Sequence, residues 1–292
     1  MSEKIITGKI LKSVGGFFHT ETPDGVVLCT ARGLFRLQNI SPCAGDNVKI
    51  TDNVITDILP RKNYIVRPPL SNLDAAFIVI STVEPAPNRL ILDKLIAIFE
   101  SKEIEPVPLF TKIDKKSEAE LSGIYKKAGF TVFSADNSSG EVTKELRGFL
   151  KNKTCAFIGN TGVGKSSTLN TLFPELTLQT AEISKKLGRG KHTTRQVELY
   201  KINQDTYIAD TPGFSTVEAA KYYGKLDSYE IALNFREFAP YIEKCKFSGC
   251  RHIKEDGCAV LAAKARGEIT ESRFESYVKI YEDAYAEERN YK

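Results

Sequence analysis

The sequence lacks long hydrophobic runs, and this absence excludes one class of protein. None of its apolar runs is longer than Ala75–Ile80, whereas a helix that spans a membrane needs about 20 consecutive apolar residues. The first residues, Met1 to Ile5, also lack the apolar stretch of a signal peptide. We therefore expect a soluble, cytoplasmic protein without a membrane partner.

Cysteine is scarce, and the charge is nearly balanced. Six cysteines in 292 residues are too few for a disulfide scaffold, and because three of them cluster near the C-terminus they indicate a metal site. The net charge of +4 is too small to mark the whole chain as a nucleic-acid binder, although it permits local basic patches. With 41% hydrophobic and 27% charged residues, the composition is that of a globular protein and excludes a disordered one.

The length suggests two or three domains, and residues 1–68 are predicted to form the first. Short apolar segments separated by glycine and proline turns predict a small β-barrel, for which we expect an OB-fold. A local surplus of basic residues leaves RNA binding and simple packing as equal alternatives for this barrel. Consecutive prolines between Arg67 and Asn72 predict a linker after it. The expected strands are Thr7–Val14, Gly25–Thr30, Gly33–Leu37, Asp46–Thr51 and Asn53–Leu59.

Strand and helix patterns alternate in residues 69–223, which predicts a mostly parallel sheet with crossover helices. Residues 224–292 contain no convincing strand pattern and predict helices, the last of them Glu271–Glu288. The strands expected in the central segment are Ala75–Ser81, Pro106–Phe110, Phe130–Ser134, Thr154–Ile158, Val197–Ile202 and Thr206–Ala209. The helices expected there are Leu90–Ser101, Ser117–Ala128, Glu141–Leu150 and Lys165–Phe173.

A phosphate-binding loop is predicted between one of these strands and the helix that follows. Residues 159–166 fit the pattern G-x-x-x-x-G-K-[ST] without a mismatch. Glycines let successive backbone N–H groups point at phosphate oxygens, the ammonium of Lys165 reaches the β and γ phosphates, and the Ser166 hydroxyl can ligate Mg²⁺. Lys165 is therefore also a catalytic candidate. The predicted phosphate ligands are Gly159, Asn160, Thr161, Gly162, Val163, Gly164, Lys165, Ser166, Ser167 and Gly213.

The sequence Asp-Thr-Pro-Gly at residues 210–213 follows another expected strand. A nucleotidase with this kind of loop needs a second carboxylate on the Mg²⁺ side. We expect Asp210 to supply it and the amide of Gly213 to sense the γ-phosphate. In isolation the segment would be an ordinary turn, but beside the phosphate-binding loop it completes a nucleotide site.

Two short elements indicate that the base is guanine. Thr111-Lys112-Ile113-Asp114 resembles the motif [N/T]-K-x-D, in which the carboxylate accepts the N1 and N2 protons that adenine cannot offer and the lysine stem packs on the base. Ser134-Ala135 matches the element whose backbone supports guanine O6. Because Thr111 replaces the commoner asparagine, we expect the loop to lose one side-chain brace.

The order of these motifs is unusual, because the base-reading elements precede the phosphate-binding loop and Asp210 follows it. All are expected at the C-terminal ends of parallel strands, where ligands bind. This circularly permuted order, with a barrel in front and a cysteine cluster behind, resembles the RsgA-type (YjeQ-like) ribosome-assembly GTPases over essentially the whole chain.

The resemblance implies a multidomain protein with an OB-fold that binds RNA (1–68), a circularly permuted α/β P-loop GTPase domain (69–223) and a mostly helical zinc-binding domain (224–292). It also implies hydrolysis of GTP to GDP and binding to the small (30S) ribosomal subunit and its rRNA. The family acts late in maturation of that subunit, which stimulates the GTPase. We expect a monomer.

A basic segment, Ser184–Arg195, lies between the phosphate-binding loop and Asp210. As the switch threonine does in this class, Thr193 or Thr194 could bring a hydroxyl to Mg²⁺, and spacing does not choose between them. The run of charge is either a solvated basic loop or, as we favour, a contact with a phosphate backbone.

The residue after Gly213 is Phe214, where many GTPases carry the glutamine that orients the attacking water. Phenylalanine cannot do this, so we expect slow intrinsic hydrolysis. Help must come from His192 or from a group on the ribosome, and the family resemblance supports His192, although a lone loop histidine is more often incidental.

The cysteine cluster has the pattern C-x₄-C-x-H-x₅-C, formed by Cys245, Cys250, His252 and Cys258. Three thiolates and an imidazole suit tetrahedral Zn²⁺, and because no open position is evident we expect one structural ion per chain. The alternative is a set of reduced cysteines without a ligand.

Two other functions stay open at this point. Phe214 would also suit a nucleotide-gated RNA-binding module with negligible hydrolysis. An ATPase is the other alternative. The substitution Asp114→Asn distinguishes a GTPase from an ATPase, because it would strongly reduce hydrolysis of GTP but not of ATP.

Overall fold

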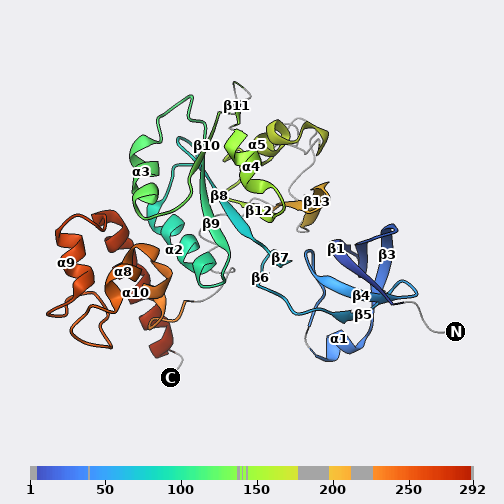
Figure 1. Cartoon of the computed structure of the whole chain (residues 1–292), viewed down its shortest axis with the longest axis horizontal. Coiled ribbons are helices and arrows are strands. Elements are labelled where there is room, and N and C mark those ends of the chain that lie inside the picture. The colour runs from blue at the N-terminus through green and yellow to red at the C-terminus, as the bar shows by residue number, and fades with distance from the viewer. Residues whose placement is uncertain are drawn as a thin grey trace.

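The computed structural model describes residues 5–38, 40–136, 139, 141–142, 144–176, 197–211 and 226–290. The chain forms three units (Figure 1): a barrel near the N-terminus, drawn in blue, a central α/β unit in cyan to yellow, and a helical unit in orange and red. The α/β unit lies between the other two in this view. No helix among the described residues is long and apolar enough to cross a bilayer.

The N-terminal unit is a five-stranded barrel, as the sequence predicts. Strand β1 pairs with both β2 and β4, and β5 joins β4 to β3, which closes the sheet. Alternate side chains such as Ile10, Phe18 and Ile55 point inward and form its core. The strands are β1 (Ile6–Val14), β2 (Phe17–Thr22), β3 (Gly25–Ala31), β4 (Asn47–Thr51) and β5 (Val54–Ile58).

Two local predictions for the barrel are wrong. Residues 17–22 form β2, which the apolar pattern did not reveal because two of its inward positions are Thr20 and Thr22. The expected strand Gly33–Leu37 is instead the short helix α1 (Leu34–Leu37). Its Leu37 is 81% exposed, so this apolar residue belongs to the surface and was a misleading signal for a half-buried strand.

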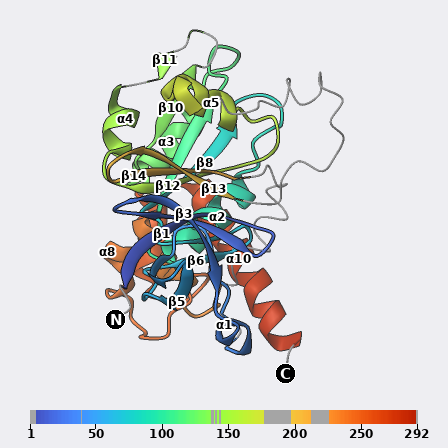
Figure 2. The same cartoon turned by 90° about the vertical axis from the view of Figure 1, so that its right-hand side faces the viewer.

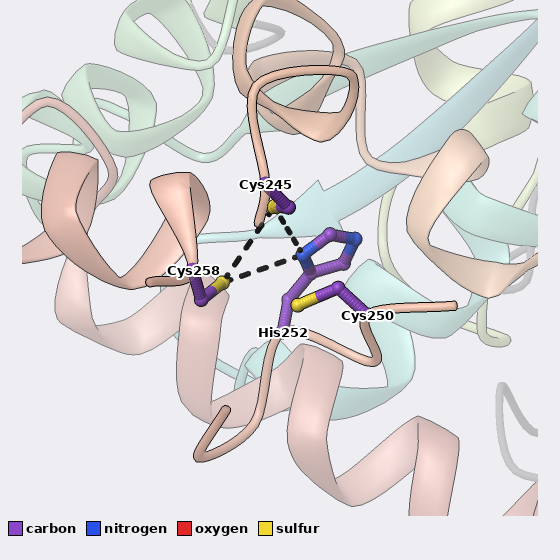
Figure 3. A group of neighbouring side chains, drawn as sticks. All are labelled: Cys245, Cys250, His252 and Cys258. Atoms are coloured by element: carbon purple, nitrogen blue, oxygen red, sulfur yellow. Dashed lines mark hydrogen bonds between the residues drawn. The ribbon is translucent and has the colours of Figure 1, made fainter. Parts of the chain in front are cut away.

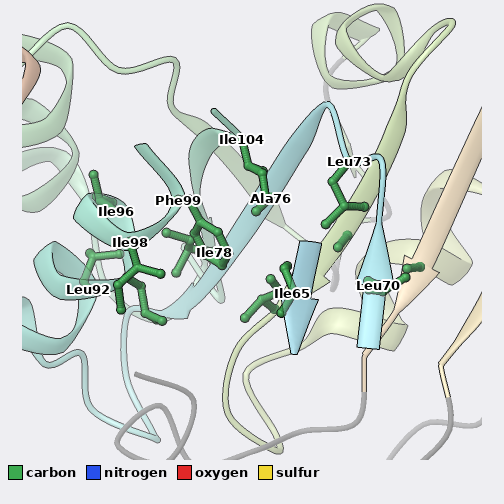
Figure 4. Close-up of a cluster of buried hydrophobic side chains, with 14 of the residues drawn as sticks. Ile65, Leu70, Leu73, Ala76, Ile78, Leu92, Ile96, Ile98, Phe99 and Ile104 are labelled. Carbon is green, nitrogen blue, oxygen red and sulfur yellow. The ribbon is translucent and has the colours of Figure 1, made fainter. Parts of the chain in front are cut away.

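The expected linker after the barrel is an ordered hairpin, so that prediction is also wrong. Strands β6 (Tyr64–Val66) and β7 (Pro69–Ser71) pair across a cis Arg67–Pro68 bond. Pro69 is tolerated because it begins a strand in a sheet of only two strands. Side chains of this hairpin join those of the α/β unit in one hydrophobic cluster, which includes Ile65, Leu70 and Ile78 (Figure 4).

Buried polar contacts fasten the hairpin to the barrel. Asp46 is fully buried and accepts hydrogen bonds from the Arg61 guanidinium and from the Ser71 hydroxyl at 2.6 Å. Gly45 has a φ of +93°, and a Cβ atom there would lie 2.1 Å from the carbonyl oxygen of Ser71, so only glycine permits this close approach. The hairpin is therefore joined to the barrel by buried contacts.

The α/β unit is a mostly parallel sheet in the order β10-β9-β8-β12-β14-β13, with helices on both faces. The helix expected at Glu141–Leu150 is shorter, because its first residues form β11. The strands are β8 (Ala75–Ser81), β9 (Glu105–Thr111), β10 (Phe133–Asp136), β11 (Glu141–Val142), β12 (Thr154–Ile158), β13 (Glu198–Asn203) and β14 (Thr206–Asp210). The helices are α2 (Arg89–Glu100), α3 (Ala119–Lys127), α4 (Lys144–Leu150) and α5 (Lys165–Leu172), followed by the 3-10 turn η1 (Pro174–Leu176).

The barrel and the α/β unit share one sheet. Strand β1 pairs antiparallel with β13, which makes a 12-stranded sheet out of the two units. Figure 2 shows the blue barrel strands lying against β13 at this junction.

The C-terminal unit, residues 226–290, contains helices joined by turns and has no strand among its described residues. It packs on α2, where the guanidinium of Arg273, only 1% exposed, donates to Asp93 at 2.7 Å and forms two hydrogen bonds with Glu237. Its elements are η2 (Ile231–Asn234), η3 (Arg236–Phe238), α8 (Ala239–Ile242), α9 (Ala259–Ala265) and α10 (Glu271–Asn290).

Candidate nucleotide and metal sites

The predicted phosphate-binding loop runs from the end of β12 to the start of α5. Gly162 and Gly164 have φ values of +82° and +104°, which side-chain-bearing residues rarely adopt. A Cβ atom on Gly159 would lie 2.6 Å from the carbonyl oxygen of Val79. These glycines therefore permit the curled backbone that turns N–H groups toward an anion at the N-terminus of α5.

Lys165 is buried beneath this loop. Its ammonium donates to the carbonyl oxygens of Gly159 at 2.8 Å and Asn160 at 2.9 Å. Burial lowers the pKa of Lys165 to about 8, while the nearby Asp210 carboxylate opposes that shift. The ammonium thus lies within the loop where phosphate oxygens are expected.

Asp210, the last residue of β14, contacts Ser166 in the first turn of α5. The Ser166 hydroxyl donates to Oδ2 of Asp210 at 3.0 Å. The other oxygen, Oδ1, is buried and has no hydrogen-bond partner among the residues that the structure describes. Burial raises the pKa of Asp210, and Lys165 and Ser166 oppose this rise. A carboxylate oxygen without a partner beside a serine hydroxyl is a donor set that fits Mg²⁺.

The base motif begins at the last residue of β9. The Thr111 hydroxyl donates to the carbonyl oxygen of Val163 in the phosphate-binding loop and contacts that of Ile80 at 3.3 Å. The expected loss of a side-chain brace is therefore not observed, because threonine itself connects the base motif to the loop. Lys112 follows with a φ of +58°, in the left-handed region, so the chain turns at the end of β9 just before Asp114.

Three residues that sequence reasoning missed hold the base elements. The carbonyl oxygen of Glu84 accepts a hydrogen bond from the Lys112 ammonium, and Thr82 donates to the Lys112 carbonyl oxygen at 2.8 Å. Glu118 accepts from the Ser134 hydroxyl at 2.8 Å. None of the three belongs to a motif, so only spatial proximity reveals them.

Ser134 and Ala135 lie within β10 rather than after it. Ala135 is the parallel register partner of Thr111, so the two base elements are neighbours in the sheet. The predicted site residues His192, Thr193, Thr194 and Gly213 lie outside the described residues.

The cysteine cluster is assembled in the C-terminal unit (Figure 3). One ligand atom from each of Cys245, Cys250, His252 and Cys258 lies within 4.8 Å of the others. Nδ1 of His252 is 3.4 Å from the sulfurs of Cys245 and Cys258, which are 4.0 Å apart. Four ligands around a tetrahedral zinc ion would place two sulfurs about 3.8 Å apart and a sulfur about 3.6 Å from a nitrogen. The residues present fit zinc.

Local structure fixes these ligands. The carboxylate of Glu255 accepts hydrogen bonds from the amides of Arg251, Ile253 and Lys254, which folds the loop around His252. Burial lowers the pKa of His252, so the neutral form that binds metals is favoured. The sulfur of Cys258 accepts from the Leu261 amide at the start of α9.

Comparison with known proteins gives matches along nearly the whole chain. The family model described as RsgA GTPase matches residues 58–220, and that of the RsgA N-terminal domain matches residues 7–56. A protein of Caldanaerobacter subterraneus subsp. tengcongensis named small ribosomal subunit biogenesis GTPase RsgA is 40% identical, over 98% of this chain and 99% of its own. A relative from Oceanobacillus iheyensis, named small ribosomal subunit biogenesis GTPase RsgA 2, is also 40% identical, over 97% and 99%.

Solved structures agree with this result. YjeQ from Thermotoga maritima superposes with a TM-score of 0.79 at 30% identity and covers 97% of this chain and 99% of its own. YloQ, described as a circularly permuted GTPase, gives a TM-score of 0.76 at 29% identity, over 97% and 96%. The chain belongs to the RsgA GTPase family.

Proposed function

We propose that this protein is a GTP hydrolase that binds the small (30S) ribosomal subunit, acts late in its maturation and is stimulated by it. The observation that carries the GTPase part is the hydrogen bond from Thr111 to Val163. It joins the base motif to the phosphate-binding loop, so that Asp114 and Lys165 can hold two ends of one nucleotide. The names of the relatives support the ribosomal part.

Each residue of the site has a role that follows from its position. Asp114 selects guanine, and the Lys165 ammonium turns from the loop carbonyls to the β and γ phosphates. Ser166 and Asp210 hold Mg²⁺, which supplies charge neutralisation on the phosphates. Gly159 to Ser167 provide amides around the phosphates, and Ser134 and Ala135 line the base.

Hydrolysis needs groups beyond these. Phe214 cannot orient water, so intrinsic turnover is slow, and His192 or a ribosomal group supplies what is missing. Thr193 or Thr194 completes the Mg²⁺ ligands, and the Gly213 amide senses the γ-phosphate. The basic segment Ser184–Arg195 contacts rRNA phosphates, which makes binding dependent on salt.

Each of the three units has a separate role in the proposed function. The barrel (1–68) binds rRNA, the central unit (69–223) hydrolyses GTP, and the helical unit (224–292) carries one structural zinc ion and contributes to subunit binding. The Cys₃His set offers four protein ligands and leaves no open position, which supports a structural role rather than a catalytic one. The protein acts as a cytoplasmic monomer.

GTP hydrolysis measured with and without purified small subunits tests the proposal. We expect slow phosphate release alone and a large increase with subunits. Asp114→Asn should abolish that increase with GTP, while Glu120→Gln, at an exposed position of α3 in the same unit, serves as its matched control. Phosphate release that stays at background with subunits would favour a nucleotide-gated RNA-binding module instead, and ATP use that survives Asp114→Asn would indicate an ATPase.

A further inference from the structure

The barrel covers an edge of the nucleotide-binding sheet. Strand β13 would be the last strand of that sheet, but β1 of the barrel pairs with it, with Lys12 opposite Glu198. The ammonium of Lys12 lies 2.9 Å from Oε1 of Glu198, and both side chains are about one-third exposed. An exposed pair of this kind contributes little by itself, but it marks the register between the two units.

The same register extends across the β13–β14 hairpin to a residue of the predicted phosphate site. Glu198 is the antiparallel partner of Asp210 in the β13–β14 hairpin. Lys12, Glu198 and Asp210 therefore occupy corresponding positions on three neighbouring strands. The last of them is the carboxylate that accepts from Ser166.

A second barrel residue holds the same hairpin more firmly. Glu21 on β2 is only 16% exposed, and its Oε2 accepts from the Tyr207 hydroxyl at 2.6 Å. Its other oxygen is paired with the Lys201 ammonium. Lys201 and Tyr207 are register partners across β13 and β14, so one carboxylate of the barrel holds both strands of the hairpin.

The energetics favour Glu21 as the main connection. Hydrogen bonds to an ionised carboxylate are stronger than neutral ones, and partial burial reduces their screening by solvent. The ammonium of Lys9, which faces Glu21 across β1 and β2, lies 5.2 Å from the centre of the Tyr207 ring and adds a cation–π contact. Tyr207 is the second residue of β14, the strand that ends with Asp210, so the contact acts three residues before this carboxylate.

We propose that Glu21 is a positioning residue of the GTPase site. It holds the β13–β14 hairpin against the barrel and thereby places the Asp210 carboxylate beside Ser166. A partner that displaces the barrel then acts on the Mg²⁺ side of the phosphate site. The inference rests on the proposed function, because it assumes that Asp210 serves a bound nucleotide.

Nucleotide affinity with and without Mg²⁺ tests the proposal. The variants are Glu21→Ala and the isosteric Tyr207→Phe. The control is Asp57→Asn, which breaks an exposed 3.0 Å ion pair with Lys49 on the surface of the barrel. The dissociation constant of a fluorescent GTP analogue is measured on the full chain in Mg²⁺ and in EDTA. In Mg²⁺ we expect both variants to weaken binding by about fivefold, the size of one net hydrogen bond. In EDTA they should match wild type, because Asp210 acts through the metal.

The double variant adds a second readout. Because both substitutions remove the same contact, Glu21→Ala with Tyr207→Phe should weaken binding no more than Glu21→Ala alone. Additive losses would overturn the inference, as would variants that behave like Asp57→Asn or that weaken binding equally with and without Mg²⁺. If Glu21→Ala does not fold, Tyr207→Phe decides, since it removes a single oxygen. Wild-type protein that binds no guanine nucleotide would instead refute the proposed function, and this inference with it.

Discussion

The hydroxyl of Thr111 donates to the carbonyl oxygen of Val163 and so connects the predicted base motif to the predicted phosphate-binding loop. Both residues are buried. The bond crosses from the end of β9 to the loop before α5, two segments that are distant in the sequence. It fixes the distance between the two halves of the site.

Thr111→Val should weaken binding of both GTP and GDP by about tenfold. The substitution keeps the shape of the side chain but leaves the buried Val163 carbonyl without this donor, which costs about 1–3 kcal/mol. Isothermal titration with each nucleotide measures the effect. Thr111→Ser keeps the hydroxyl and should stay near wild type, so equal affinities of the valine and serine variants would contradict this role.

Nucleotide affinity should fall at alkaline pH because of Lys165. Its pKa in the free protein is about 8, below the ordinary value of 10.5, so the ammonium is charged below pH 8 and loses its proton above it. Phosphates bind the charged form and raise the pKa, so the dissociation constant of GDP should increase by about tenfold per pH unit above pH 8. Lys165→Arg, which stays charged, should bind less tightly but with a flat profile. A flat profile for the wild type up to pH 10 would disprove the prediction.

Removing one cysteine of the C-terminal cluster should remove the metal. We expect close to one zinc per wild-type chain and almost none in Cys258→Ser, with a lower melting temperature, because structural zinc contributes directly to folding. Metal analysis and thermal unfolding measure this. Cys29→Ala, in the barrel core, should keep its zinc. Equal zinc content and equal resistance to a chelator in all three proteins would exclude the site.

Arg273→Met should destabilise the protein by about 3–5 kcal/mol, because it leaves the buried carboxylates of Asp93 and Glu237 without their partner. Denaturant unfolding provides the measurement. Arg266→Met removes an exposed ion pair with Glu268 in the same unit and should change stability little. If the two variants are equally stable, the buried cluster does not hold the C-terminal unit on α2.

Much of the nucleotide site could be predicted from the sequence because its chemistry requires fixed spacings. Lys165 and Asp210 were recognised from short motifs, and the structure brings them close enough for each to affect the pKa of the other. The four residues of the Cys₃His cluster likewise form a pattern in the sequence. The buried strands β8 and β12 matched their predicted bounds because continuous apolar runs indicate strands covered on both faces.

The rest depends on contacts between residues that are distant in the sequence. Strand β2 was missed because threonines occupy its inward positions, and the hairpin β6–β7 was missed because its prolines predict a break. Glu118 and Glu21 carry no local signal, since a glutamate side chain that accepts a hydrogen bond inside the fold looks like any surface glutamate in the sequence. Glu84 acts through its backbone carbonyl oxygen, which any residue would supply. Only the tertiary structure identifies them.

The pairing of β1 with β13 has a consequence for any shortened form of the chain. An unpaired strand at the side of a sheet is a template for self-association, and the barrel protects the GTPase unit from this. A truncation that begins after residue 59 would remove the barrel, which we propose binds rRNA, and would also expose β13, so the shortened protein should aggregate. Loss of ribosome binding in such a fragment would therefore combine two defects, and point substitutions on the barrel separate them.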